Sequence, residues 1–339
     1  MFGLVEVEER IWRQAGVSCE RIFAAAIGVR HRGKSAPLKR VLSDFGAEHS
    51  FMQAAGRVKE HYGFAITASA VRTSTLETAR RAEAILEKKY AQSFRSLPAK
   101  GAATIVAQAD GTMICTVAPG SRRGPRPRSW NEMRLVAAQA QGSSQAIYGA
   151  TFGPVEEAGR AWAHCARDVG RGLNSHLHVV ADGAPWISLQ AQEVFGADHR
   201  FLCDFFHVSE YLAAAAKTCA ATRSEPWRKT QQKRLKRSAS PLVIEELAHY
   251  LEPPGTPEPE APVRNAHRYL TNRASSLDYR SALEQGLPIG SGLIESGHRH
   301  VLQARLKKAG TSWLPDSAHS LAQLRVLRAN NLWPSLWNN

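Results

Sequence analysis

Residues 103–111, ATIVAQADG, decide the fold: a short apolar run rich in β-branched residues ends at Asp110 and Gly111. A run of this length and composition predicts a buried strand. The Asp-Gly pair predicts the end of that strand, because both residue types favour turns. Residues 113–117, MICTV, predict a second strand after the turn. The chain therefore changes from helical to strand periodicity near residue 102.

More strands are predicted downstream of this stretch. Their ranges are 135–140, 146–152, 177–181 and 200–203, and a helix is predicted among them at 155–169. The strand at 177–181 also ends at an Asp-Gly pair, Asp182 and Gly183, and the strand at 200–203 ends at Asp204. Strands interleaved with a helix indicate a mixed α/β core.

Helical patterns lie on both sides of this core. Upstream, residues 50–62 and the stretch from about 67 to 86 have helical periodicity, which fits a DNA-binding helix-turn-helix or a plain helical hairpin. Downstream, helices and a proline-rich loop interrupt the core. The predicted organisation is a helical, DNA-binding region at 1–100, the first part of the core at 101–208, an all-helical insertion at 209–286 and the last part of the core at 287–339.

The composition favours a polyanionic partner. The 339 residues include 44 Lys and Arg against 30 Asp and Glu, a formal net charge of +14, and 43% hydrophobic residues. That excess points to nucleic acid ahead of a membrane surface. The longest apolar run near the start, residues 22–29, is far below the roughly 18 residues of a spanning helix. Five cysteines without CxxC spacing predict neither a disulfide framework nor a zinc site, and place the chain in a reducing cytoplasm.

Three carboxylates stand out as candidates for catalysis. Asp110 and Asp182 follow predicted strands, and Glu295 begins a predicted helix. Oxygen donors from separate elements suit Mg²⁺, and two such ions about 3.5–4 Å apart can cleave a phosphodiester. The alternative is that both Asp-Gly pairs are only turns and that Glu295 is a solvated helix residue.

Basic and aromatic residues supply candidate contacts to DNA. One set lies in a loop before residue 130, a second in the predicted insertion and a third after Glu295. The alternative for each set is a solvated surface. The candidates are Arg122, Arg123, Arg126, Trp227, Lys233, Arg234, Arg299, Arg305, Lys307 and Lys308.

Several motifs resemble a known family. Residues 290–296, GSGLIES, and residues 300–310, HVLQARLKKAG, look like the Glu-bearing helix of bacterial insertion-sequence transposases of the DDE superfamily. The C-terminal residues 324–328, LRVLR, are similar to the end of that family. Asp204 and His207 match the Asp-x-x-His signature of members with a helical insertion, such as Mutator-like transposases. The ISKra-type branch is the nearest.

This resemblance implies an RNase H-like core in which Asp110, Asp182 and Glu295 are the catalytic, metal-binding triad. It implies two Mg²⁺ ions, for which Mn²⁺ can substitute, and Asp204 and His207 near the site without ligating a metal. The implied reaction is cleavage at element ends followed by strand transfer from a 3′-hydroxyl. The implied partners are double-stranded DNA with inverted repeats and further copies of the chain, in association with a bacterial nucleoid.

Two other functions remain open from the sequence. One is a DNA-binding protein derived from a transposase that performs no chemistry. The other is a structure-specific nuclease or resolvase on the same core, which would cut branched DNA but join no ends.

Overall fold

The computed structural model describes residues 8–9, 15, 22–26, 33–93, 96–120 and 127–337. The chain divides into two compact units built from segments distant in sequence. The terminal unit comprises Met1–Lys88, Ile114–Asn131 and His300–Asn339. The core unit comprises Lys89–Met113 and Glu132–Arg299. The four predicted segments remain a prediction.

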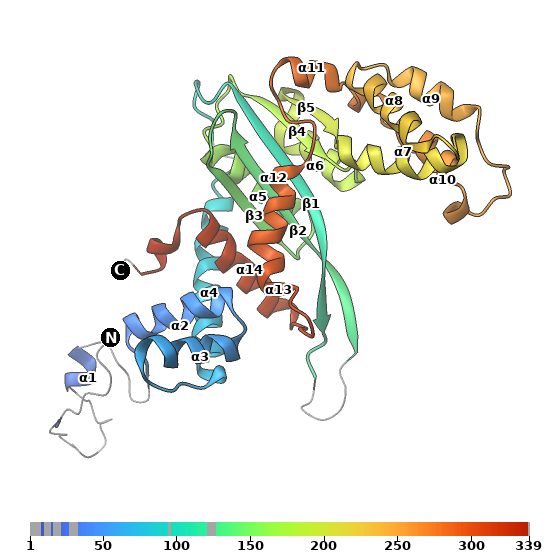
Figure 1. The fold of residues 1–339 in the computed structure, drawn as a ribbon. Helices are drawn as coiled ribbons and strands as arrows, with labels where there is room; N and C mark the ends of the chain where they lie inside the picture. The colour runs from blue at the N-terminus through green and yellow to red at the C-terminus, as the bar shows by residue number, and fades with distance from the viewer. Residues whose placement is uncertain are drawn as a thin grey trace. The chain divides into compact units, whose positions relative to one another are not determined.

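The core unit is built on a five-stranded sheet with the order β3-β2-β1-β4-β5 (Figure 1). β1 pairs in parallel with β4, β4 pairs in parallel with β5, and β2 pairs antiparallel with β3. The predicted mixed α/β class is therefore confirmed. The strands are β1 (Thr104–Val117), β2 (Arg128–Ala140), β3 (Ala146–Thr151), β4 (His176–Ala181) and β5 (His199–Cys203).

The predicted break at Asp110 and Gly111 is wrong. β1 is a single strand of 14 residues that runs through both positions, and Gly111 is not among the glycines with a positive φ. β2 also begins earlier than predicted, at Arg128. The reason is pairing: β1 and β2 are hydrogen-bonded neighbours, and this satisfies the backbone of a dipeptide that would otherwise favour a turn.

The two faces of the sheet are covered by different helices. Ile105 and Ala107 of β1 belong to a hydrophobic cluster with α5 (Val155–Asp168) and α6 (Pro185–Phe195). Val106, between them, belongs to the other large cluster of the core unit. This alternation follows from the two-residue period of a strand. Even-numbered residues of β1 therefore face away from α5 and α6.

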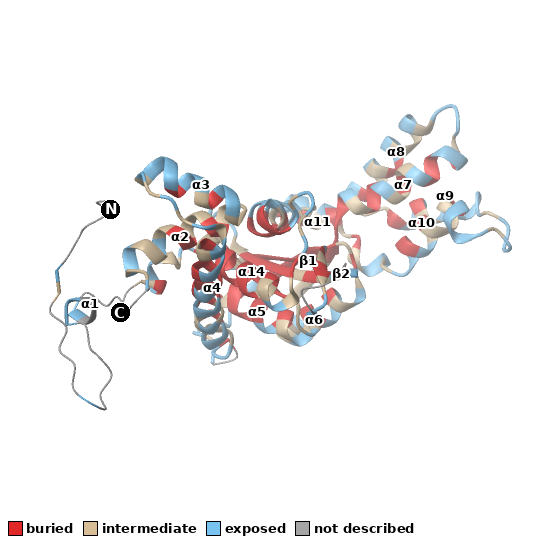
Figure 2. Cartoon of the chain, turned by 90° about the horizontal axis from the view of Figure 1, so that it is seen from below, coloured by how far each residue is buried: buried red, intermediate tan, exposed pale blue. Residues whose placement is uncertain are grey.

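The segment predicted to be a helical insertion consists of helices and turns, and these helices share one hydrophobic cluster with β4 and β5. Buried residues continue through α7 and α10 (Figure 2). Its elements are α7 (Phe205–Cys219), α8 (Ser224–Lys236), α9 (Ser240–Ala248), α10 (Pro262–Thr271) and α11 (Tyr279–Glu284), with 3₁₀ turns at Glu258–Glu260 and Ala274–Ser276. One further 3₁₀ turn, Gly196–Asp198, precedes β5.

The terminal unit is mostly helical. The predicted helix at 50–62 is confirmed as α3, where Ser50 and Gln53 form a capping box and Gly63 ends the helix with φ +74°. The helical elements with residues in this unit are α1 (Ile22–Ala26), α2 (Ala36–Glu48), α3 (Phe51–Tyr62), α4 (Ala68–Tyr90), a π-helical turn (His298–Gln303), α13 (Ala304–Leu306), α14 (Pro315–Ala329) and a 3₁₀ turn (Trp333–Leu336). None of the helices in the described ranges combines the length and apolar character needed to cross a bilayer.

Candidate active site

Three aspartates form a row across the parallel strands of the core unit. β1 pairs with β4 so that Gln108 lies opposite Val180, and two residues further Asp110 is level with Asp182. The pairing of β4 with β5 places Asp204 level with Asp182 in the same way. Side chains two residues apart share a face, so all three carboxylates are on the face opposite α5 and α6. Ligands of open α/β sheets bind at this end of parallel strands.

The Asp110 carboxylate is partly exposed and lies beside an imidazole ring. Its Oδ1 accepts a hydrogen bond from the Gly111 N–H at 2.7 Å. Its Oδ2 lies 3.2 Å from Nε2 of His298, although the angle is outside hydrogen-bond geometry. Asp110 therefore keeps one oxygen directed to the helix that follows Glu295.

The Asp182 carboxylate lies in a turn that is hydrogen-bonded to residues of α10 and the segment after it. Oδ1 accepts a hydrogen bond from the Ala184 N–H at 2.9 Å, and Gly183 has φ +83°. The hydroxyl of Tyr269 donates to the Asp182 carbonyl, and Arg273 donates to the Gly183 carbonyl at 2.8 Å. Burial raises the pKa of Tyr269, so its hydroxyl remains a donor. The second Asp-Gly pair is therefore a turn, as its sequence predicts.

Asp204 is a buried, fully engaged carboxylate. It is 2% exposed. Oδ1 accepts hydrogen bonds from the N–H groups of Phe206 at 2.6 Å and His207 at 3.1 Å, which caps α7. Oδ2 accepts from the Ser291 N–H at 2.8 Å and from the Ser291 hydroxyl. Asp204 thus fixes the loop that leads to Glu295.

The segment carrying Glu295 lies on the same face of the sheet as the three aspartates. The amide of Gln108 donates to the Gly290 carbonyl at 3.1 Å and accepts from the Ile294 N–H at 2.9 Å. Helix α12 (Gly292–Gly297) then packs closely: a Cβ on Gly297 would lie 2.7 Å from the Tyr148 ring. Glu295 itself is exposed.

His298 is a site residue that the sequence reasoning did not assign. It is 4% exposed and begins the π-helical turn that continues α12; such turns are frequent at functional sites. It stands three residues after Glu295, a spacing that puts two side chains on one helix face. That spacing is the signal that could have identified it.

The His207 side chain lies apart from the carboxylates. Its Nδ1 is 3.6 Å from Glu210, and its ring packs edge-on against Tyr211 and Tyr269, with centroids 5.4 and 5.7 Å away. Its link to the aspartate row is its backbone N–H, which donates to Asp204.

The donor set suits Mg²⁺ in its chemistry, because all three candidates offer carboxylate oxygens. Asp182 and Glu295 each keep one oxygen to which no described residue donates a hydrogen bond. Among the residues that the structure describes, however, no three His, Cys, Asp or Glu side chains are close enough together to hold a metal ion. Binding a metal would require the carboxylates to draw closer.

The predicted DNA contacts of the core unit fall into two groups. Lys233 and Arg299 are exposed. Arg234 is half-buried and lies 3.6 Å from Glu246, while Trp227 packs against the insertion cluster and donates to Glu246 at 3.3 Å. A partly buried Trp227 offers less of its ring for base stacking.

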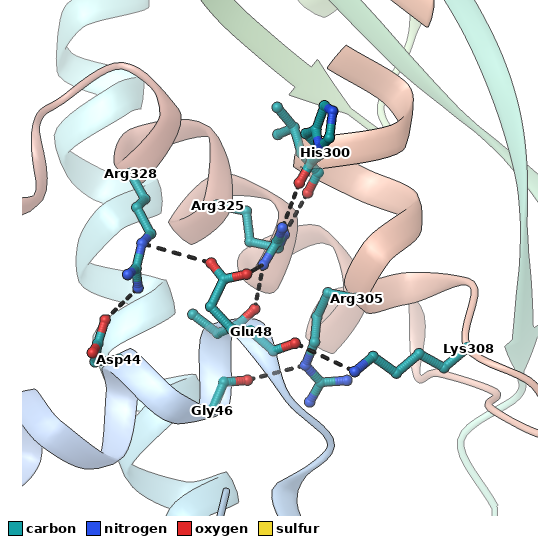
Figure 3. A network of polar contacts seen from close by, with 10 residues as sticks. Asp44, Gly46, Glu48, His300, Arg305, Lys308, Arg325 and Arg328 are labelled. Atoms are coloured by element: carbon teal, nitrogen blue, oxygen red, sulfur yellow. Dashed lines mark hydrogen bonds and ion pairs between the residues drawn. The ribbon is translucent and has the colours of Figure 1, made fainter. Parts of the chain in front are cut away.

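The other predicted DNA contacts belong to the terminal unit. Lys307 is exposed. Arg305 is buried, and its Nε donates to the Gly46 carbonyl at 3.0 Å, while Lys308 donates to the Glu48 carbonyl at 3.3 Å (Figure 3). The residues Arg122, Arg123 and Arg126 lie outside the described ranges.

Arg305, Lys308 and Arg325 donate hydrogen bonds to the last carbonyl groups of α2. Arg325 donates to the Ala47 carbonyl at 2.6 Å and lies 2.9 Å from a Glu48 carboxylate oxygen (Figure 3). The last carbonyls of a helix lack intrahelical partners and carry its negative dipole end, so cations stabilise them. Arg305 is therefore partly engaged within the chain through its Nε, and its predicted phosphate contact stays a prediction.

A protein-family model matches part of the chain. The model of an uncharacterised protein family, UPF0236, matches residues 167–333, which include Asp182, Asp204 and Glu295 but not Asp110. No curated protein matches the chain. Over just under half of its length, the chain is thus similar to this family.

Proposed function

We propose that this protein is a DNA transposase of an insertion sequence, of the DDE type, which cleaves and joins phosphodiesters with Mg²⁺. The observation that carries the proposal is the row of Asp110, Asp182 and Asp204 on the sheet face that also holds the Glu295 segment. The RNase H-like architecture and the ISKra-type branch belong to the same proposal.

Asp110, Asp182 and Glu295 would hold the metal. Bound Mg²⁺ supplies an activated nucleophile and neutralises the leaving oxygen of a phosphodiester. The partly exposed Asp110 and the exposed Glu295 let a duplex approach. Asp204 and His298 are positioning residues: Asp204 holds the loop before Glu295, and His298 faces the Asp110 carboxylate.

The proposed reaction has two balanced steps. Water attacks a phosphorus atom at the element end, the bond to the 3′-oxygen breaks, and a free 3′-hydroxyl results. This hydroxyl then attacks a phosphorus atom of the target strand, forming a new phosphodiester and releasing the target's own 3′-hydroxyl. The net charge of +14 attracts both polyanionic strands.

The test uses a labelled duplex carrying the inverted repeats that flank the gene. We expect nicking and joining with Mg²⁺ or Mn²⁺, none with EDTA, and a loss of at least about a hundredfold in Asp182→Asn, since positioned metal ligands supply several kcal/mol. Asn keeps the side-chain oxygen that accepts from Ala184, so the turn survives.

Asp198→Asn is the matched control, because Asp198 is an exposed aspartate of the same unit whose nearest cation is 4.0 Å away. It should cut like the wild type. Cutting of branched DNA without joining would favour the nuclease alternative. DNA binding without cutting, equal in wild type and Asp182→Asn, would favour the non-catalytic DNA-binding protein.

A further inference from the structure

A second polar site lies wholly within the terminal unit. It is a cavity of about 740 Å³, formed by the start of α3, the first turns of α4, the hairpin end of β1 and β2, and residues 310–317. Three of its lining residues are arginines: Arg72, Arg128 and Arg305. No Asp or Glu is among the described residues that line it. The cavity is therefore strongly cationic.

Arg305 forms the inner wall of this cavity. It is 1% exposed, and its guanidinium carbon lies over the rings of Phe51 and Trp313, at 4.7 and 4.9 Å from their centroids. Its Nε is satisfied by Gly46, but its Nη2 has no hydrogen-bond partner. A buried N–H donor without a partner costs about 1–3 kcal/mol, so an acceptor from outside the chain would offset that cost.

Arg72 and Arg128 form the outer wall. Both are exposed, and no described residue gives either of them a hydrogen bond or an ion pair. This sets them apart from the exposed arginines of the core unit such as Arg160, which lies 3.9 Å from Glu157. Two unpaired guanidinium groups on separate elements repel each other unless an anion lies between them.

The start of α14 adds to the attraction for an anion. The helix begins after Leu314, and no side chain caps its first N–H groups. Leu314 and Ser317 line the cavity, so the positive end of the helix dipole faces it. Asp316 is the acidic residue of this first turn; it is exposed and does not line the cavity.

We propose that this cavity binds a phosphate group of the DNA backbone. The inference deepens the proposed function, on which it rests for its choice of polymer. A single phosphate is much smaller than about 740 Å³, so the cavity has room for the sugars on either side. Guanidinium groups bind phosphate oxygens in pairs, which suits a contact that positions the duplex without reading its sequence.

The test compares two double variants of the full chain. In Arg72→Ala/Arg128→Ala, duplex affinity measured by fluorescence anisotropy should fall about tenfold at moderate salt. The slope of log affinity against log salt should decrease by about one, as expected for one lost phosphate contact. Arg72→Lys/Arg128→Lys should keep most of the slope, because the charges remain.

The matched control is Arg160→Ala/Arg280→Ala, which also removes two exposed arginines, each paired with a glutamate. It should change the affinity less than twofold. An unchanged affinity and salt slope in Arg72→Ala/Arg128→Ala would overturn the proposal. So would stabilisation by inorganic phosphate that disappears in this variant while duplex affinity stays unchanged, because the cavity would then be a small-anion site.

These outcomes are separate from those of the cleavage assay. If the chain binds DNA through the cavity but never cuts it, the transposase proposal fails and the cavity proposal stands. If metal-dependent cutting occurs while the cavity variant binds and cuts normally, the cavity proposal fails and the transposase proposal stands.

Discussion

The two Asp-Gly pairs of the core unit have the same local sequence and opposite structures. Asp110 and Gly111 run straight through β1. Asp182 and Gly183 form a turn with φ +83° at the end of β4, held by Tyr269 and Arg273. Their carboxylates nevertheless end level with each other, because the register of the parallel strands fixes their positions.

The difference teaches that the neighbouring strands and helices, not the dipeptide, select the conformation. At Asp110 the strand β1 continues, with β2 as its hydrogen-bonded neighbour. At Asp182 the strand β4 has ended, and the neighbouring β5 gives way to α7 after Cys203. Among the described residues, the Asp110 carboxylate bonds only the next backbone N–H, so its side chain is free to change rotamer. The Asp182 carboxylate is held in place by the hydrogen bonds of its turn.

The third aspartate of the row gives the largest expected effect. Asp204→Ala should lower the free energy of unfolding by about 3 kcal/mol or more, because it removes the cap of α7 and leaves Ser291 without its buried acceptor. Asp110→Ala should change it by less than about 1 kcal/mol, since Asp110 is partly exposed and bonds only its own neighbour. Urea unfolding measures both.

Comparable losses in the two variants would mean that Asp110 is as structural as Asp204. Asp204→Asn separates the hydrogen bonds from the charge. Its single side-chain oxygen can still cap α7 but cannot also accept both bonds from Ser291, so an intermediate loss is expected.

The two glycines test the comparison directly. Gly183→Ala should cost about 2 kcal/mol, because an L residue is strained at φ +83° and its Cβ would lie 2.4 Å from Nε of Arg273. Gly111→Ala should cost about 1 kcal/mol or less: its φ is not positive, and its Cβ meets the partly exposed Glu132 side chain, which can move.

Urea unfolding midpoints of the two glycine variants measure these two losses in the free energy of unfolding. Equal losses would contradict the assignment of a turn at one pair and a strand at the other. A loss confined to Gly183→Ala should also be partly relieved by Arg273→Ala in the same chain, because the substituted Cβ then has room.

Sequence patterns predicted what depends on neighbouring residues. The α3 helix, the strands β3 to β5 and the Asp182 turn follow from period and turn chemistry, and the structure confirms them. The unbroken β1 was missed because its pairing with β2 is a tertiary effect that outweighs the turn preference of Asp-Gly.

The sequence predicted that Asp110, Asp182 and Asp204 each follow a strand, whereas Asp110 lies inside β1 and only Asp182 and Asp204 follow strand ends. Their common row depends on strand register, which no local pattern contains. The bond from Arg305 to the Gly46 carbonyl was missed for a related reason: the two residues are 259 positions apart in sequence.

The smallest expected effect concerns the loop before Glu295, which His178 ties to β4. Nε2 of His178 lies 2.8 Å from the Pro288 carbonyl, and burial lowers the pKa of His178. The unfolded state, with a pKa of about 6.5, therefore binds more protons at pH values between the two pKa values. The free energy of unfolding should thus decrease as pH falls through 6.5 toward the folded pKa.

Urea unfolding between pH 7.5 and 5.5 measures this dependence. His178→Gln removes the titrating group while its amide can still donate to Pro288, so the pH dependence should become shallower. Some dependence should remain, because burial also lowers the pKa of His164. An unchanged slope would show that His178 does not couple protonation to this loop. The Glu295 segment would then be held chiefly by its hydrogen bonds to Gln108 and Asp204.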